Sequence, residues 1–232
     1  MFKIRQRWSY QGSNGPDAWA VEFPGCGGTA QSPIDIVRRQ AVNGSTIPLA
    51  FDYRPIQATL FNNGFTMQVD TSPGCVLTWR GSPYDLVQFH WHCQSEHTID
   101  GRPFPMELHL VHQSREAEAF AVIGVMLEHG AHQDAYDLLW HDLPTDDVKQ
   151  NIFDEFDPSV LLPSRRDYFL YEGSLTTPPC TEAVSWLLLE EPFPVSKKQI
   201  ENFEHLYPDN HRPRQPLNGR RVHFVRGASS RT

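Results

Sequence analysis

The sequence lacks long apolar runs and clusters of basic residues. No stretch approaches the roughly 18 apolar residues that a transmembrane helix needs, so we expect no membrane-spanning segment. Lys and Arg total 20 against 28 Asp and Glu, which gives a formal net charge of −8 with histidine neutral. Because contact with phosphates requires clustered Lys and Arg, this balance argues against a nucleic-acid partner.

Cysteine is also scarce, with four residues in the chain. None of them forms a Cys-x-x-Cys pair, which argues against a zinc site made of four cysteines. Two interpretations stay open at this point: buried thiols in a cytosolic protein, or one or two disulfides in an exported one. Four cysteines allow three full pairings, and spacing does not choose among them.

The two ends carry little information. Lys3, Arg5 and Arg7 are followed by no apolar stretch, so the start does not resemble a signal peptide. Either the protein is made without one, or this is a mature chain behind a new start methionine. No repeat or linker divides the chain, and its 19 prolines are spread along it. We therefore expect an N-terminal extension at residues 1–7, one domain at residues 8–226 and a flexible tail at residues 227–232.

Strand patterns dominate the domain, and several are apolar on both faces, as in the central strands of a covered sheet. The expected strands are residues 57–70 with a break at 62–64, residues 76–79, 84–92, 106–112, 119–128, 168–171 and 183–190. Two short helices are expected at residues 135–141 and 196–207. The second opens with a capping box from Ser196 to Gln199. The sequence thus predicts a mainly β fold of the β-rich α+β class.

The strongest chemical pattern is Gln88-Phe-His-Trp-His92. Alternate side chains of a strand share a face, so Gln88, His90 and His92 point the same way. A second expected strand contains Glu107-Leu-His109, which places Glu107 and His109 on one face. If the two strands pair, three imidazoles converge. Three neutral imidazoles with an open fourth position form one type of catalytic zinc site.

The same alternation supplies partners for these imidazoles. A metal-bound imidazole usually donates its other N–H to a carboxylate, amide or carbonyl. Gln88 lies two residues before His90, and Glu107 lies two residues before His109. Both are polar at positions where an ordinary core strand would carry Val or Ile, which strengthens the metal interpretation.

Two alternatives compete with a zinc site. A His-x-His pair in a strand is often only half exposed and binds no metal. The spacing His90-x-His92-x-x-x-Glu96, with His109 later, also fits a cupin-type metal site. Cupins usually place Gly about six residues after this Glu and Pro-x-Gly before the last His. Here Gly101 comes earlier and Pro103-Phe-Pro105 replaces the second motif, which weakens the cupin interpretation.

Motifs spread along nearly the whole chain match one family in the family's order. They are Trp8-Ser-Tyr10, Gly15-Pro16 with Trp19, Gln31-Ser-Pro-Ile-Asp-Ile36, Asn62-Asn-Gly64, Gln88-Phe-His-Trp-His92, Ser95-Glu-His97, Glu107-Leu-His-Leu-Val-His112, Gly173-Ser-Leu-Thr-Thr-Pro-Pro-Cys180, Val184 with Trp186, and Arg212 with Gln215-Pro-Leu217. Together they resemble an α-class carbonic anhydrase of the bacterial, exported type.

The resemblance implies one catalytic domain, built on a large twisted, mostly antiparallel sheet of about ten strands with short peripheral helices. It implies a zinc lyase that reversibly hydrates carbon dioxide to bicarbonate and a proton by attack of zinc-bound hydroxide. Carbon dioxide, bicarbonate and water are then its partners, and a homodimer is left open. The alternative is a non-catalytic, carbonic-anhydrase-like binding module.

The resemblance also assigns site residues. It makes His90, His92 and His109 the ligands of Zn²⁺. It makes Thr176 the hydroxyl that accepts from the attacking hydroxide and donates to ionised Glu96. The second-shell partners of the ligands are Gln88, Glu107 and the backbone of Asn210. The wall that accepts carbon dioxide comprises Val111, Val122, Leu175, Thr177, Val184 and Trp186.

The chain departs from the family after Asn62-Asn63-Gly64. Fast members often carry a proton-shuttling histidine at the next position, which here is Phe65. A phenyl ring exchanges no proton, whereas a histidine with a pKa near 6.5 does. We therefore expect proton transfer to limit turnover. Tyr10, Asn63 and Gln68 match positions that order the water path.

The resemblance pairs Cys26 with Cys180 in a disulfide. The bridge would hold the loop that bears Thr176, and it favours a secreted or periplasmic protein. Cys75 and Cys93 have no assigned partner.

Overall fold

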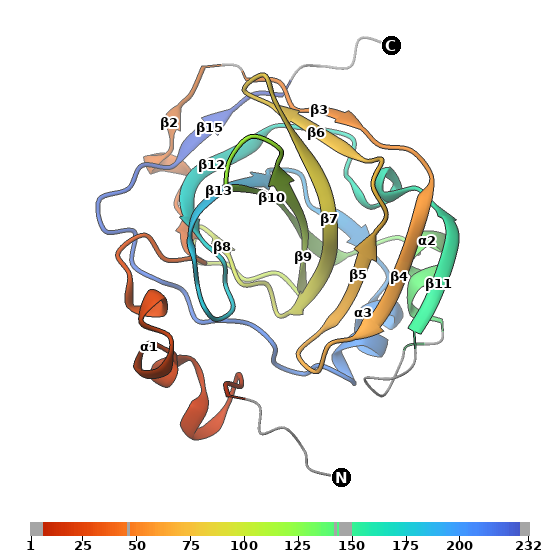
Figure 1. Cartoon of the computed structure of the whole chain (residues 1–232), viewed down its shortest axis with the longest axis horizontal. Helices are drawn as coiled ribbons and strands as arrows, with labels where there is room; N and C mark the ends of the chain where they lie inside the picture. Colours follow the sequence, from red (N-terminus) through yellow and green to blue (C-terminus); the bar gives the residue numbers. More distant parts are fainter. Residues whose placement is uncertain (1–6, 46, 142, 144–149, 228–232) are drawn as a thin grey trace.

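A computed structural model describes residues 7–45, 47–141, 143 and 150–227. Its main element is a 13-stranded twisted sheet, which curls around the middle of the view in Figure 1. Ten strands follow one another across it in the order β11 (Gln150–Phe156), β4 (Ile56–Asn62), β5 (Met67–Thr71), β7 (Ser82–Cys93), β9 (Met106–Ser114), β10 (Phe120–His129), β13 (Glu182–Leu189), β12 (Tyr168–Ser174), β15 (His223–Val225) and β2 (Val42–Asn43). This path confirms the expected large sheet of about ten strands.

Shorter strands complete the sheet structure. Three pair off the main path, namely β3 (Ala50–Asp52), β6 (Val76–Trp79) and β14 (Phe193–Val195). A separate pair is formed by β1 (Asp35–Ile36) and β8 (Thr98–Ile99). Most pairings in the main sheet are antiparallel, but β10 pairs in parallel with β13 and β14, and β15 with β2. Parallel neighbours need long connections, and α2, β11 and β12 lie between β10 and β13 in the chain.

Helices are short and peripheral, as expected. They are α1 (Trp19–Glu22), α2 (Asp134–Trp140) and α3 (Lys197–Glu204), with 3-10 turns at Gly12–Asn14, Pro16–Ala18, Pro24–Gly27, Arg38–Gln40 and Pro158–Leu161. The expected capping box is present at the start of α3, between Ser196 and Gln199. In the described part of the chain, no helix is long and apolar enough to cross a membrane.

The two faces of strand β9 carry different kinds of buried residue. Leu108 and Leu110 are fully buried in the main apolar core, which α2 and α3 cover. On the same core side, Trp91 of β7 packs 5.5 Å from Trp140, measured between ring centroids. The alternate residues of β9, Glu107 and His109, are also buried but lie on the opposite face. The strand therefore carries its polar residues towards a second, smaller interior.

Seven strands were not expected from the sequence, namely β1, β2, β3, β8, β11, β14 and β15. The edge strand β11 pairs only with β4 and has mostly exposed or half-exposed residues. Its sequence, Gln-Asn-Ile-Phe-Asp-Glu-Phe, does not alternate apolar and polar residues, so its strand form depends on pairing with β4. At the C-terminal end, the Gly227 N–H donates to Asp167 Oδ1 at 2.8 Å. Residues 1–6 and 228–232 lie outside the described residues, so the extension and tail remain predictions.

Candidate metal centre

Strands β7 and β9 bring the histidines of the two sequence motifs together. They pair antiparallel, with His90 directly opposite His109 and His92 opposite Glu107. The pairing on which the sequence argument depended is therefore present. Gly124 of β10 lies opposite His109, where a Cβ would come within 3.3 Å of Glu107 Oε1 and 2.4 Å of Leu188 Cδ2. A glycine at this position leaves room for the buried carboxylate.

The three imidazoles converge on one point. One ring nitrogen from each of His90, His92 and His109 lies within 4.8 Å of the corresponding atom of the other two. Their ring centroids are 4.7 to 5.2 Å apart. Among the described residues, only one other group of potential ligands comes as close, and its members, His97, Glu107 and His109, are joined by hydrogen bonds.

Each imidazole uses its other nitrogen to donate a hydrogen bond. The pairs are His90 Nδ1 to Gln88 Oε1 at 2.8 Å, His92 Nδ1 to the Asn210 carbonyl at 2.7 Å and His109 Nε2 to Glu107 Oε1 at 2.9 Å. The nitrogens left over are Nε2 of His90, Nε2 of His92 and Nδ1 of His109. His92 Nε2 is buried without a hydrogen-bond partner in the described structure. Three free lone pairs that face one another suit a cation.

Burial keeps these imidazoles neutral. It lowers the pKa of His92 to about 4 and lowers the pKa values of His90 and His109 below their usual value. The cause is that a buried imidazolium loses its hydration. Neutral rings offer lone pairs near pH 7, which is the form that binds metal.

A chain of buried polar groups runs behind His109. Burial would raise the pKa of Glu107, but His97 and His109 outweigh it and hold that pKa well below its usual value. His97 Nδ1 lies 2.7 Å from Glu107 Oε1, and His97 Nε2 lies 2.5 Å from Tyr171 Oη, which is 2.8 Å from Ser32 Oγ. His97 and Ser32 lie in motifs that were recognised in the sequence without an assigned role, and Tyr171 was not expected at the site. The one signal for Tyr171 in the sequence was its polar hydroxyl in a mostly apolar stretch of β12.

Glu96 and Thr176 are both buried, and Glu96 lies beside the histidines. Glu96 Oε1 accepts from the Arg212 backbone N–H at 2.7 Å, while Oε2 lies 4.0 Å from His109 Nδ1 and has no hydrogen-bond partner among the described residues. Burial raises the pKa of Glu96, and His109, the Arg212 N–H and the Thr176 hydroxyl oppose that rise. Glu96 is not in the histidine ligand group, contrary to what a cupin-type site would require.

A cavity of about 100 Å³ opens beside His90 and His92. The residues that line it are Trp8, Tyr10, Asn63, Phe65, Thr66, Gln68, Gln88, His90, His92 and Thr177. All four residues expected on the proton path are therefore at this cavity. The expected wall for carbon dioxide is divided. Thr177 lines this cavity, whereas Val111, Val122, Val184 and Trp186 form a separate buried cluster with Leu175 packed against it. Trp186 connects this cluster to the histidine centre, because its ring centroid lies 4.8 Å from the ring centroid of His109.

The rim of the cavity is aromatic. The rings of Phe65 and Trp8 stack with centroids 3.6 Å apart and planes within 5° of parallel. Tyr10 meets the same two rings edge-on. Burial, followed by the charge of Glu96, raises the pKa of Tyr10 well above its usual value, so this phenol stays protonated at neutral pH.

An amide chain follows the polar side of the cavity. Asn63 Nδ2 donates to Gln68 Oε1 at 2.9 Å, and Gln68 Nε2 donates to Asp70 Oδ1 at 2.6 Å. Asn63 Oδ1 accepts from the N–H groups of Phe65 and Thr66. Both amides therefore have a fixed orientation.

The structure contains the expected disulfide between Cys26 and Cys180, with a Cα–Cα distance of 4.8 Å. Cys75 and Cys93 are free thiols, both buried in the main core. The bridge joins the turn at Pro24–Gly27 to the end of the loop that bears Thr176. It thus links the N-terminal region to the histidine centre.

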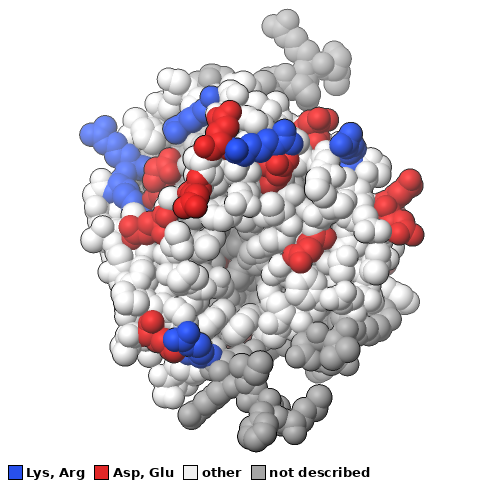
Figure 2. All heavy atoms as spheres, viewed as in Figure 1, with Lys and Arg blue, Asp and Glu red and all other residues white. Residues whose placement is uncertain are grey.

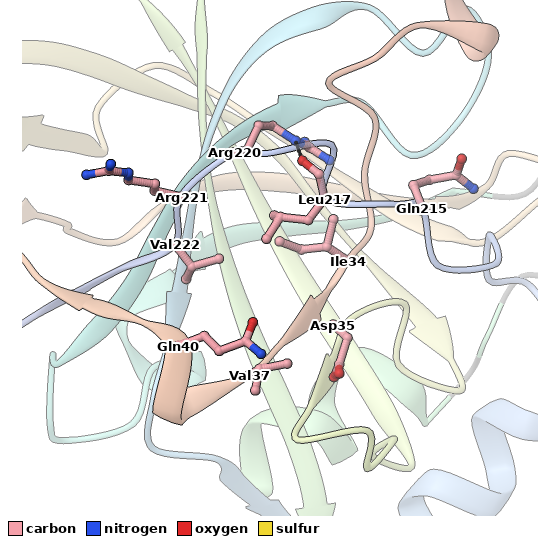
Figure 3. Close-up of a pocket in the computed structure, with 9 residues that line it drawn as sticks. All are labelled: Ile34, Asp35, Val37, Gln40, Gln215, Leu217, Arg220, Arg221 and Val222. Atoms are coloured by element: carbon pink, nitrogen blue, oxygen red, sulfur yellow. Dashed lines mark hydrogen bonds between the residues drawn. The ribbon is translucent and has the colours of Figure 1, made fainter.

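One larger cavity offers less chemistry. Figure 3 shows this cavity of about 350 Å³ between the β1 region and residues 215–222. Its Arg220 donates to four backbone carbonyls, and its Asp35 accepts from Thr98 Oγ1 and the Gly101 N–H. These hydrogen bonds join separate segments of the chain and so stabilise the fold.

On the face in Figure 2, charges of both signs are scattered around a hollow near the middle, with no basic stripe among the described residues.

The comparisons with known proteins agree with this geometry. Residues 14–226 match the family described as eukaryotic-type carbonic anhydrase. The chain belongs to this carbonic anhydrase family. It is 38% identical to a carbonic anhydrase of Nostoc sp. over 93% of this chain and 84% of that protein. It is 39% identical to one of Klebsiella pneumoniae, over 93% of this chain and 89% of that protein.

Solved structures of carbonic anhydrases share the fold. The α-carbonic anhydrase from Thermovibrio ammonificans, solved with the inhibitor sulfanilamide, superposes with a TM-score of 0.89 at 37% identity. The match covers 93% of this chain and 98% of that one. The chain is therefore an enzyme of the carbonic anhydrase class, and the cupin alternative is wrong.

Proposed function

We propose that this carbonic anhydrase reversibly hydrates carbon dioxide to bicarbonate and a proton, with a zinc ion held by His90, His92 and His109. One observation supports the proposal above all. One nitrogen of each neutral imidazole faces the other two rings, while the other nitrogen of each ring donates a hydrogen bond to a protein oxygen. Three histidines suit Zn²⁺, which binds imidazole and keeps a fourth position open in catalytic sites. A zinc ion held by these three residues would lower the pKa of water to about 7 and so supply hydroxide at neutral pH.

Thr176 and Glu96 orient the attacking group. An ionised Glu96 only accepts hydrogen bonds, so the Thr176 hydroxyl donates to it and its own oxygen accepts from the hydroxide. These two residues would thereby orient the attacking group towards the substrate carbon. The unpartnered Oε2 of Glu96 and the effect of Thr176 on its pKa support this arrangement.

The apolar cluster beside His109 suits an uncharged substrate. Val122, Val184 and Trp186 are buried, and Trp186 reaches the His109 ring. Carbon dioxide carries no charge and no donor, so apolar contact is the main way for a protein to accommodate it. We assign these residues, with Val111, Leu175 and Thr177, to the carbon dioxide site.

Proton release is the slow part of this cycle in our proposal. Phe65 holds no exchangeable proton, and its ring is stacked on Trp8. Protons must then leave along water ordered by Tyr10, Asn63 and Gln68. We expect slower proton transfer with Phe65 at this position, because a phenyl ring offers no group with a pKa near 6.5 to pass the proton to buffer.

We also propose that the protein is exported. Structural disulfides persist mainly in oxidising compartments, and this chain contains one. Bacterial carbonic anhydrases are among its relatives. Its location is testable by fractionating cells that make the native gene product.

The direct test combines metal analysis with stopped-flow measurement of carbon dioxide hydration. We expect one zinc per chain, a rate well above buffer, loss of rate after removal of zinc with a chelator and recovery when zinc is restored. The variant His132→Ala is a control, because this exposed histidine contacts Asp137 on the surface. A protein that binds zinc but gives no rate above buffer would support the non-catalytic binding module instead.

A further inference from the structure

Arg212 connects the catalytic region to the disulfide-bearing segment. Its backbone N–H donates to Glu96 Oε1 at 2.7 Å. Two residues earlier, the Asn210 carbonyl accepts from His92 Nδ1, and Asn210 Oδ1 accepts from the Cys93 N–H. This irregular segment therefore contacts both the histidine centre and Glu96.

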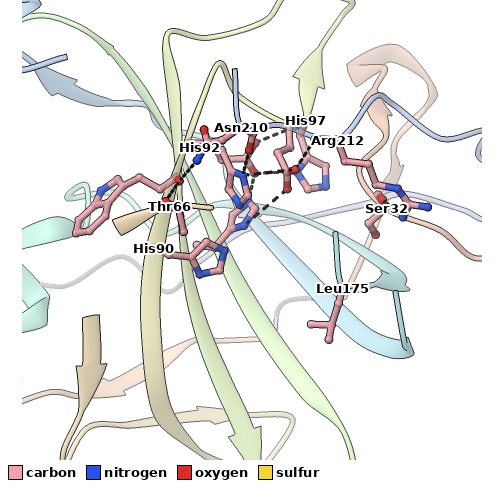
Figure 4. Close-up of polar contacts among 12 residues, drawn as sticks. Ser32, Thr66, His90, His92, His97, Leu175, Asn210 and Arg212 are labelled. Atoms are coloured by element: carbon pink, nitrogen blue, oxygen red, sulfur yellow. Dashed lines mark hydrogen bonds and ion pairs between the residues drawn. The ribbon is translucent and has the colours of Figure 1, made fainter. Parts of the chain in front are cut away.

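The guanidinium of Arg212 is buried against neutral oxygens. The residue is 2% exposed. Nη1 donates to Gln31 Oε1 and to the Ser32 carbonyl, each at 2.8 Å, and Nη2 donates to the Cys26 carbonyl at 3.0 Å. Figure 4 shows its side chain reaching towards Ser32. Among the described residues, no carboxylate forms an ion pair within 4.0 Å of this guanidinium. Burying a charge without such a partner is costly.

The loop that bears Thr176 is attached to the same place. The Ser32 N–H donates to Ser174 Oγ at 2.9 Å, and the Ser174 N–H donates to Ser32 Oγ at 3.0 Å. Ser174 precedes Thr176 by two residues. Both members of the Thr176–Glu96 pair are therefore fixed relative to Ser32, one through Ser174 and the other through Arg212.

We propose that Arg212 is a positioning residue, which holds Glu96 at the right distance and direction for the Thr176 hydroxyl. This inference rests on the proposed function, because it assigns Arg212 a role in carbon dioxide hydration. The guanidinium fixes the segment against Gln31 and Ser32, and the backbone N–H of the same residue fixes the carboxylate. A small displacement of Glu96 turns the Thr176 hydroxyl away and removes the orientation of the attacking hydroxide.

Arg220 provides a matched control. It also donates to the carbonyl of Gln31, at 2.7 Å, and to three other backbone carbonyls, but it makes no hydrogen bond to Glu96. Loss of either arginine removes several hydrogen bonds from the same segment. Only loss of Arg212 should disturb the catalytic pair.

The test measures kcat/KM for carbon dioxide hydration, zinc content and thermal stability for Arg212→Met, Arg212→Lys and Arg220→Met. For Arg212→Met we expect zinc content near that of the unmodified protein and kcat/KM lower by roughly ten- to a hundredfold. Arg212→Lys keeps the charge and should recover part of the loss. Arg220→Met should lower stability and leave kcat/KM unchanged. If Arg212→Met does not fold, the comparison of Arg212→Lys with Arg220→Lys decides in the same way.

A double variant separates positioning from general damage. In a Glu96→Gln background, Arg212→Met should cause no further fall in kcat/KM, because the group that it positions has already lost its function. An equal further fall would overturn the inference, as would full activity of Arg212→Met alone. If the unmodified protein itself hydrates no carbon dioxide, the proposed function fails, and the inference about Arg212 fails with it.

Discussion

The histidine centre and the aromatic rim lie on the same small cavity but are built in opposite ways. At the centre, each of the three imidazoles is fixed by one hydrogen bond, as His90 is by Gln88 and His109 is by Glu107. At the rim, Phe65 and Trp8 are held by stacking and carry no group that exchanges a proton near neutral pH. In our proposal, the centre holds the groups needed for attack on carbon dioxide, whereas Phe65 at the rim offers no group that would carry the proton away. Changes at the centre should therefore abolish activity, whereas changes at the rim should adjust it.

The largest effect is expected for His92→Ala. This change removes a ligand whose free nitrogen has no protein partner, so we expect zinc content near zero and hydration at the buffer rate. Metal analysis and stopped-flow kinetics measure both. Substantial hydration activity without bound zinc would show that the centre is not where the reaction occurs.

The next effect is expected for Thr176→Val, which keeps the shape of the side chain and removes its hydroxyl. Zinc should remain bound, since Thr176 is not among the ligands, while kcat/KM falls by about a hundredfold or more, the usual cost of losing one oriented hydrogen bond at the reacting group. Thr177→Val is the neighbouring control and should cost far less. Equal losses for both variants would contradict the role given to Thr176.

A smaller effect is expected for Gln88→Ala. Loss of the hydrogen bond to His90 Nδ1 should weaken zinc affinity by about ten- to a hundredfold, as is usual for groups that orient a metal ligand. Competition with a chromophoric chelator measures this affinity. Gln68→Ala, on the same cavity but bonded to Asn63 and Asp70, should leave it unchanged.

The smallest effect, and a gain, is expected for Phe65→His. A histidine at the rim should raise kcat several-fold in dilute buffer, because it can exchange protons near pH 7. Phe65→Ala controls for opening the stack on Trp8. Added imidazole should raise kcat of the unmodified enzyme more than that of Phe65→His. If Phe65→His is no faster and imidazole has no effect, proton transfer does not limit turnover.

The centre was more predictable from the sequence than its surroundings. Strand alternation alone placed His90 and His92 on one face, and one assumed pairing added His109. The partner of His92 was not visible in any local pattern, because Asn210 lies 118 positions later, and it was expected only from the family resemblance. The stack of Phe65 on Trp8 and the contacts of Arg212 likewise depend on how distant segments meet.

The same limit applied to the fold. Strands of the central sheet were expected because burial on both faces leaves continuous apolar sequence. The edge strand β11 was missed, because its apolar residues do not alternate with polar ones and pairing with β4 makes it a strand. The positions of residues that follow from local periodicity could be predicted. The positions of residues that depend on contacts between distant segments required the structure.

One titration tests the central claim most directly. Zinc is added stepwise to metal-free protein, and the rate of carbon dioxide hydration is followed in parallel with the same titration of His92→Ala. We predict that the rate of the unmodified protein rises in proportion to zinc and stops rising at one zinc per chain, while His92→Ala stays at the buffer rate. A rate that is independent of zinc, or that rises equally in His92→Ala, would contradict the account.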